Sequence, residues 1–135
     1  MKTSTVLERA DVVLIAAAAE AEARRNGWAV TIAIVDHGGH LLALDRLDGA
    51  APATAHIAPA KANTAALVGK ESKGFEDQIN GGRFAFLSVP TLQGVLEGGV
   101  PIIKDGQCIG AVGVSGVRPE QDAQVARAGI AALDL

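Results

Sequence analysis

The spacing of apolar residues changes from helical to strand-like near residue 27. Apolar side chains recur every three or four positions between Leu7 and Ala21, which predicts an amphipathic helix over residues 5–25. The run Thr5–Glu8 has the spacing of a capping box at the start of this helix. Asn26-Gly27 contains residue types that tolerate the left-handed backbone at a helix end, so the helix is expected to end there.

A β-hairpin is predicted next. Residues 28–35 are apolar and largely β-branched on successive positions, which is typical of a central strand covered on both faces. The polar residues Asp36-His37-Gly38-Gly39 form the expected turn, and residues 40–46 return as a partner strand.

Helices are predicted in the middle of the chain. A turn at residues 48–52 leads into an alanine-rich helix that ends at Val68. Pro59 lies in the first turns of this helix and predicts either a kink or a start later than Thr54. A short helix over residues 72–79 follows, and then an irregular stretch.

The last third of the chain predicts a second hairpin. A short strand is expected near residues 95–97, and Gly98–Gly116 has the pattern of two strands joined by the turn Asp105-Gly106. Pro119 is suited to the first position of a final helix. The element order is αββααβββα, and its consecutive hairpins favour an antiparallel sheet with helices packed on it, an α+β fold. The two glycine-rich turns are expected at a common rim of that sheet.

Composition narrows the classes of partner. The 135 residues suit one domain over the whole chain, residues 1–135, with 49% hydrophobic and 20% charged residues. Aromatic residues make up only 3% and the net charge is −3, which argues against nucleic acid as a partner. Cys108 is the only cysteine, so no internal disulfide is possible. No apolar run approaches the length of a membrane span, and a cytoplasmic protein without a membrane partner is expected.

Three histidines are candidates for chemistry. His37 and His40 flank the first turn, where they suit a general base or a ligand, or are solvated turn residues. Asp36 is placed to orient His37, or to cap the turn itself. His56 is near the start of the second predicted helix and is either a ligand or a residue of the helix surface.

Charged side chains and glycines give further candidates for binding. Lys61 lies on an otherwise apolar side of its helix, either to offer a cation to an anionic ligand or to extend to solvent. Arg83 has a guanidinium that suits a carboxylate, or forms a surface ion pair. Glu97 is a candidate acid or base beside Gly98-Gly99, where the backbone can approach a ligand closely. The spacing of these residues indicates no particular metal.

Three runs of sequence carry a family resemblance. They are "VDHGGHLLALDRLDGA", "PAKANTAA" and "GGVPIIKDGQCIGAVGVSG", and they resemble the GlcG/HbpS-like haem-binding family, which includes the C-terminal domain of PduO proteins. The resemblance covers nearly the whole chain. It implies a five-stranded antiparallel sheet flanked by helices and homo-oligomers that are often octamers. It also implies haem binding in some members and a place beside organic-acid or aromatic catabolism in others. His56 departs from the acidic residue expected near this position.

Three functions remain open from the sequence. The first is a homo-oligomeric small-molecule binder for which haem is the implied cofactor, held in a surface groove or between subunits. The second is a small isomerase, tautomerase or hydrolase acting on a carboxylate, with His37 as acid or base and with Arg83 and Lys61 as anion anchors. The third is a non-catalytic oligomeric accessory protein. The expected partners are therefore further copies of the chain and a small anionic molecule or haem.

Overall fold

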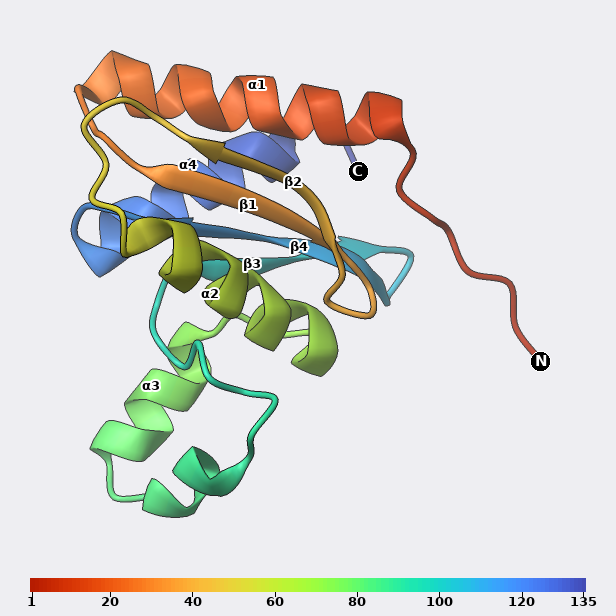
Figure 1. Cartoon of the computed structure of the whole chain (residues 1–135). Helices are drawn as coiled ribbons and strands as arrows, with labels where there is room; N and C mark the ends of the chain where they lie inside the picture. Colours follow the sequence, from red (N-terminus) through yellow and green to blue (C-terminus); the bar gives the residue numbers. More distant parts are fainter.

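The computed structural model describes all residues, 1–135 (Figure 1). It contains four α-helices, one 3₁₀ helix and four strands. In chain order they are α1 (Arg9–Asn26), β1 (Thr31–Asp36), β2 (Leu41–Arg46), α2 (Thr54–Val68), α3 (Lys73–Asn80), η1 (Phe84–Ser88), β3 (Gly99–Lys104), β4 (Gln107–Ser115) and α4 (Pro119–Ala131).

The four strands form one antiparallel sheet in the order β2-β1-β4-β3. As predicted, β1 is central and buried, with hydrogen-bonded neighbours on both sides. Asp36 at the end of β1 pairs with Gly110 near the start of β4. The β1–β2 turn and the Asp105-Gly106 turn therefore lie at the same end of the sheet, which confirms the expected common rim (Figure 1).

The predicted fifth strand is wrong. Residues 95–97 form no ladder, and the sheet has four strands, so the element order αββααβββα is also wrong by one strand. The backbone of this segment is bound by side chains instead. Ser72 Oγ donates to the carbonyl of Leu96 at 2.5 Å, and the Glu97 amide donates to Glu76 Oε2 at 3.3 Å. Hydrogen bonds to these side chains replace the pairing that an extended strand requires.

Two helix starts also differ from prediction. The first helix begins at Arg9 rather than residue 5, and its capping box is formed by Glu8 and Asp11, whose carboxylate accepts from the Glu8 amide at 2.8 Å. The second helix begins at Thr54 in spite of Pro59, so the later start is wrong. The predicted ends are confirmed, since Gly27 and Gly69 cap their helices with left-handed φ angles of 70° and 73°.

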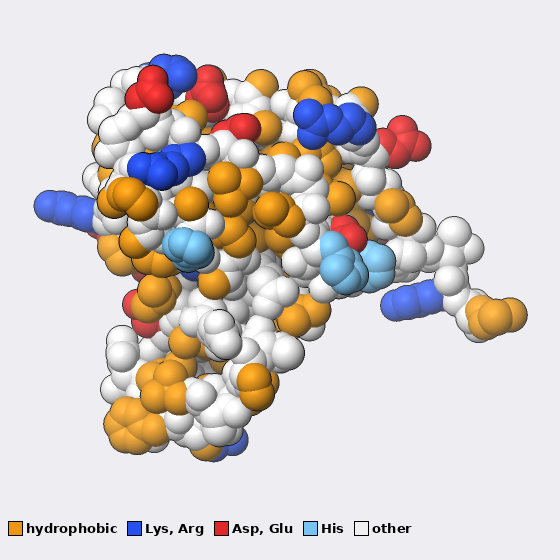
Figure 2. All heavy atoms as spheres, viewed as in Figure 1, with side chains coloured by type: hydrophobic (Ala, Val, Ile, Leu, Met, Phe, Trp, Pro, Cys, Tyr) orange, Lys and Arg blue, Asp and Glu red, His pale blue; other side chains and the backbone are white.

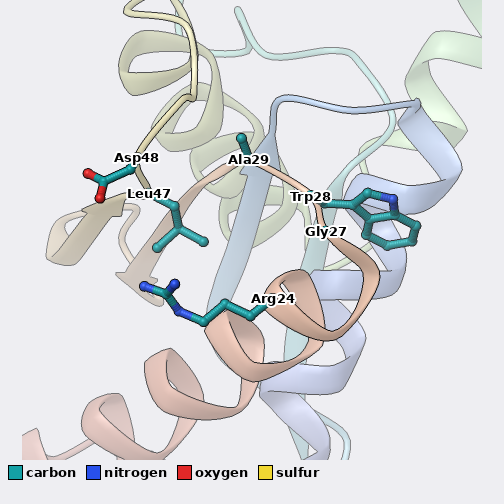
Figure 3. A pocket seen from close by; sticks show the side chains of 6 residues that line it. All are labelled: Arg24, Gly27, Trp28, Ala29, Leu47 and Asp48. Carbon is teal, nitrogen blue, oxygen red and sulfur yellow. The ribbon is translucent and has the colours of Figure 1, made fainter.

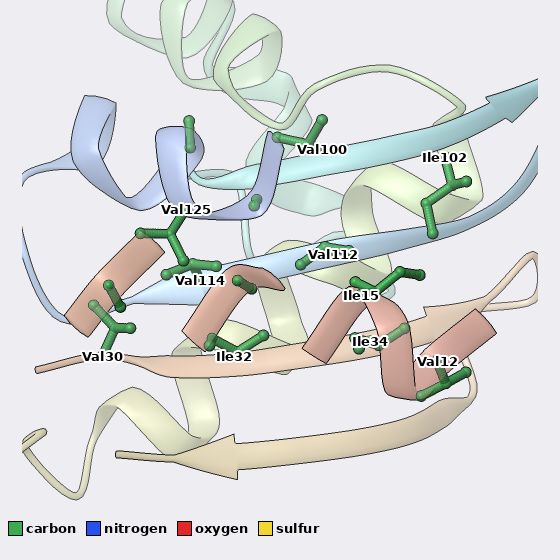
Figure 4. Close-up of a cluster of buried hydrophobic side chains, with 14 of the residues drawn as sticks. Val12, Ile15, Val30, Ile32, Ile34, Val100, Ile102, Val112, Val114 and Val125 are labelled. Atoms are coloured by element: carbon green, nitrogen blue, oxygen red, sulfur yellow. The ribbon is translucent and has the colours of Figure 1, made fainter. Parts of the chain in front are cut away.

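Helices cover both faces of the sheet. On one face α1 and α4 enclose the larger core, whose side chains include Ile15, Ile32 and Val114 (Figures 1 and 4). On the other face α2 packs through alanines against Ala33, Val35 and Ala111. A Cβ at Gly113 would collide with the Ala58 carbonyl, so α2 can lie this close only because β4 carries glycine there.

The helices α3 and η1 project from the sheet as a separate lobe, defined here as residues 70–90 (Figure 1). Phe75 and Phe86 meet edge to face with ring centroids 4.9 Å apart. Arg83 lies over the Phe86 ring at 5.2 Å. No residue of α3 or η1 is fully buried, so in one chain the lobe leaves much of its apolar surface in contact with solvent.

Candidate ligand-binding groove

A groove of about 530 Å³ lies between the β1–β2 turn, α2 and the loop after η1. Its volume falls in the range of small-molecule sites. Glycine, proline, alanine and leucine make up most of the walls, and the groove contains no charged side chain. Its lining residues are Gly38, Gly39, Pro59, Ala60, Asn63, Leu67, Pro90, Thr91 and Gln93.

The β1–β2 turn at the rim of the groove is organised by Asp36. One carboxylate oxygen of Asp36 accepts from the backbone amides of Gly38 and His40, at 2.9 and 3.0 Å. The same carboxylate contacts Nδ1 of His40 at 3.1 and 3.2 Å. Asp36 therefore caps the turn and orients His40 rather than His37.

The His40 ring is fixed on one side and open on the other. Because an ionised carboxylate only accepts hydrogen bonds, Nδ1 carries a hydrogen, and in the neutral ring the free lone pair lies on Nε2. The side chain of His40 is 80% exposed, and an added Cβ at Gly38 would contact the ring at 2.7 Å. His40 thus lies against Gly38, which lines the groove, and the lone pair on its Nε2 is available to ligate a metal.

The pKa of Asp36 reflects these contacts. Desolvation acts to raise it, but the hydrogen bonds from the His40 and Gly38 amides, and then the His40 ring, lower it by more. The pKa therefore lies below the ordinary value of 3.8. The carboxylate is ionised at neutral pH and available to hold the ring.

The other two histidines have no comparable support. His37 is exposed at the tip of the same turn, and no side chain forms a hydrogen bond with it. His56 is exposed in the first turn of α2, about one turn before Pro59 and Ala60, and no side chain forms a hydrogen bond with it.

Lys61 is engaged inside the protein. Its side chain is 4% exposed, and Nζ donates to Asp122 Oδ2 and to the Val114 carbonyl, each at 3.0 Å. Burial raises the pKa of Asp122, and the Lys61 charge and hydrogen bond only partly offset that rise. The pair connects α2 with α4 across the end of β4.

Gly98 and Gly99 pack against Lys61. A Cβ at Gly98 would lie 2.8 Å from Lys61 Nζ, and one at Gly99 would collide with the Lys61 carbonyl. Gly98 also has a φ of 129°. The structure therefore brings three predicted site residues together, at a buried contact between α2 and the start of β3.

The remaining predicted residues lie elsewhere. Arg83 is exposed in the lobe, and Glu97 is half-buried beside Glu76 at the base of the lobe. Neither lines the groove. Cys108 is half-buried in β4, with Sγ near the carbonyls of Ala66 and Gly110.

Sequence reasoning missed Asn63 and the loop Pro90–Gln93. Asn63 is a polar residue within the alanine-rich run of α2, and that contrast was an available signal. The loop offers no such signal, because its place against α2 depends on contacts between residues distant in sequence. A Cβ at Gly94 would collide with the backbone of Ala60, which shows how closely the loop approaches.

Two smaller cavities of about 260 Å³ each lie away from the groove. One is lined by Arg24, Trp28, Leu47 and their neighbours; Figure 3 shows Arg24 reaching toward Leu47 while the Trp28 ring turns away. The other lies between residues 5–7, Ile109 and the C-terminal leucines.

No group of three or more His, Cys, Asp or Glu side chains is arranged to hold a metal ion. None of the helices combines the length and apolarity needed to cross a membrane.

Comparison with known proteins identifies the family. A model described as "Haem degrading protein HbpS-like" matches residues 7–131. The GlcG protein of Escherichia coli K12 is 53% identical over 115 residues, which are 85% of each chain. The crystal structure of a Streptomyces reticuli HbpS double mutant has 30% identity and a TM-score of 0.90, over 98% of this chain and 90% of that one. A PduOC–haem complex has 29% identity and a TM-score of 0.83, over 95% of each. With a family model spanning most of its length and a relative that is 53% identical over 85% of it, the chain belongs to the HbpS-like family.

Proposed function

We propose that this protein binds haem in the groove beside the β1–β2 turn, with His40 Nε2 as the axial donor. The observation that carries the proposal is the Asp36–His40 pair in the turn whose Gly38 and Gly39 line the groove. Histidines that ligate metals commonly donate their second ring N–H to a carboxylate, which fixes the tautomer and the orientation of the ring. A related protein, PduOC, has been crystallised with haem.

The residues of the groove fit a porphyrin in part. Pro59, Leu67 and Pro90 provide apolar walls. When bound, haem supplies an iron that accepts a nitrogen donor. No cation lines the groove, so the propionates are expected to extend toward solvent or a neighbouring subunit.

A haemin titration of matched histidine variants tests this proposal. The wild type should give a saturable Soret shift. His40→Ala should weaken haem binding at least about tenfold, as should Asp36→Asn, because the ring loses its support. His37→Ala in the same turn and His56→Ala in α2 are the controls and should leave the affinity unchanged. Wild-type affinity in His40→Ala would contradict the assignment of the axial donor.

Homo-oligomerisation is the second part of the proposal. Phe84 and Leu87 in the lobe are 66% and 64% exposed, and apolar side chains gather on the projecting lobe in Figure 2. Large exposed apolar patches mark interfaces more often than free surface. The lobe runs directly into the loop that forms one wall of the groove, so a second copy seated on the lobe would lie close to the ligand site.

The carboxylate-enzyme hypothesis has less support than haem binding. Its anion anchors are Lys61, which forms an ion pair with Asp122, and Arg83, which lies in the lobe.

We further propose a cytoplasmic location and an accessory role beside organic-acid or aromatic catabolism. Growth of a deletion strain on such carbon sources, and fractionation of cells, test these two points.

A further inference from the structure

Besides α2, two segments distant in the chain form walls of the groove, and Asn63 of α2 contacts both. One wall is the Gly38-Gly39 turn, and the other is the loop Pro90–Gln93. Asn63 Nδ2 donates to the Thr91 carbonyl at 2.8 Å. On its other side, Asn63 Oδ1 lies so close to Gly39 that a Cβ there would collide with it.

The orientation of the Asn63 side-chain amide follows from its hydrogen bond with Thr91. A backbone carbonyl only accepts hydrogen bonds, so the atom of Asn63 that faces Thr91 must be Nδ2. Oδ1 therefore faces the turn. Gly39 has a φ of 80°, which favours glycine independently of the contact, so the turn can lie directly against the amide.

We propose that Asn63 is a positioning residue that holds the two walls of the groove at a fixed separation and thereby sets which flat ligand it accepts. The inference rests on ligand binding in the groove and adds the residue that determines its width. The loop carries no buried apolar side chain between Ser88 and Gln93. The Asn63–Thr91 hydrogen bond is therefore a principal attachment of that wall to α2, together with the packing of Gly94.

Matched asparagine variants separate this role from general stability. Asn63→Ala removes both contacts. Asn63→Asp keeps the shape of the side chain and its Oδ1 but removes the N–H that donates to the Thr91 carbonyl. Asn26→Ala is the control, because Asn26 Nδ2 also donates to a backbone carbonyl at 2.8 Å, that of Glu22 at the end of α1. The two pairs thus match in chemistry and differ in position.

The first measurement uses protein without haem. Hydrogen–deuterium exchange of peptides spanning residues 88–95 should accelerate about three- to tenfold in both Asn63 variants, as expected for one neutral hydrogen bond. It should be unchanged in Asn26→Ala. Unchanged exchange in Asn63→Asp would overturn the proposal whether or not the protein binds haem.

The second measurement is haem affinity together with the Soret maximum. Both Asn63 variants should bind haemin about three- to tenfold more weakly, with a shifted Soret maximum, while Asn26→Ala matches the wild type. Faster loop exchange combined with wild-type affinity and spectrum would also overturn the positioning role. If the wild type shows no saturable haemin binding, the proposed function fails, and the exchange result still decides whether Asn63 holds the wall.

Discussion

At the scale of single residues, Asp36 explains why only one of the turn histidines is organised. Its carboxylate accepts from two backbone amides and from the His40 ring. The sequence placed an aspartate at the end of a strand and left two roles open, turn cap or support for His37. The structure combines the cap with support for His40, because the turn brings the ring four residues later back over the carboxylate.

Asp36 also predicts a dependence of stability on pH. Its pKa is lowered in the folded protein, so its ionised form stabilises the fold above the ordinary pKa of 3.8, and this contribution is lost as pH falls through the lower folded value. Asp36→Asn retains an oxygen for the backbone amides but no charge. We expect wild type to be more stable than Asp36→Asn at neutral pH, by at most about 1 kcal/mol.

Urea unfolding at neutral pH and at about pH 3 measures this difference. The gap between the two proteins should narrow at the lower pH, because that pH lies below the ordinary pKa of 3.8 and the carboxyl group of the unfolded wild type is then protonated. A gap that stays constant or widens on acidification would show that the charge of Asp36 does not stabilise the turn.

At the scale of elements, Lys61 and Asp122 hold α2 and α4 to the same end of the sheet. The sequence showed a lysine on an apolar helical side but not its partner, which lies 61 residues away and follows from tertiary packing alone. Hairpins and helix ends were predictable because their signals are local. The local sequence of residues 95–97 did not exclude a fifth strand. It is the contacts with the distant residues Ser72 and Glu76 that occupy the backbone groups of this segment in the fold.

Removing one member of this pair should be costly. Lys61→Met leaves a buried carboxylate without its cation, and we expect the free energy of unfolding to fall by about 3–5 kcal/mol. Adding Asp122→Asn should recover part of the loss, because the remaining amide carries no charge. Urea unfolding at neutral pH measures both variants.

The exposed pair Lys73–Asp77 on α3 is the control. Lys73→Met removes the same charge from a solvated ion pair, so the unfolding midpoint should hardly change. Equal losses in Lys61→Met and Lys73→Met would contradict a special role for the buried pair.

At the scale of the whole molecule, the family resemblance, the α+β class and the common rim of the two hairpin turns were predictable. The ligand site was only partly so. His40 was among the candidates, whereas the groove beside it depends on a loop that returns to α2 from far along the chain. Within one chain His37, Arg83, Lys61 and Glu97 do not share a single site, because Lys61 is buried against Asp122 and Arg83 lies in the lobe.

The exposed lobe predicts assembly in solution. Light scattering coupled to size exclusion should give a mass several times the 13.7 kDa of one chain. Phe84→Ser combined with Leu87→Ser should lower that mass, because both side chains are exposed and contribute little to the core of one chain. Val6→Ser, an exposed apolar position outside the lobe, should leave it unchanged. A monomeric wild type would contradict the prediction.

The single tryptophan gives this architecture a built-in optical reporter. Trp28 precedes β1, whereas the His40 turn follows the other end of that strand, and six residues of strand extend about 20 Å. With no tyrosine in the chain, ultraviolet emission originates at that one fixed point. A porphyrin held at the turn would dim this emission through space, by resonance energy transfer. The loss of this emission when haemin is added would therefore report binding without any added label.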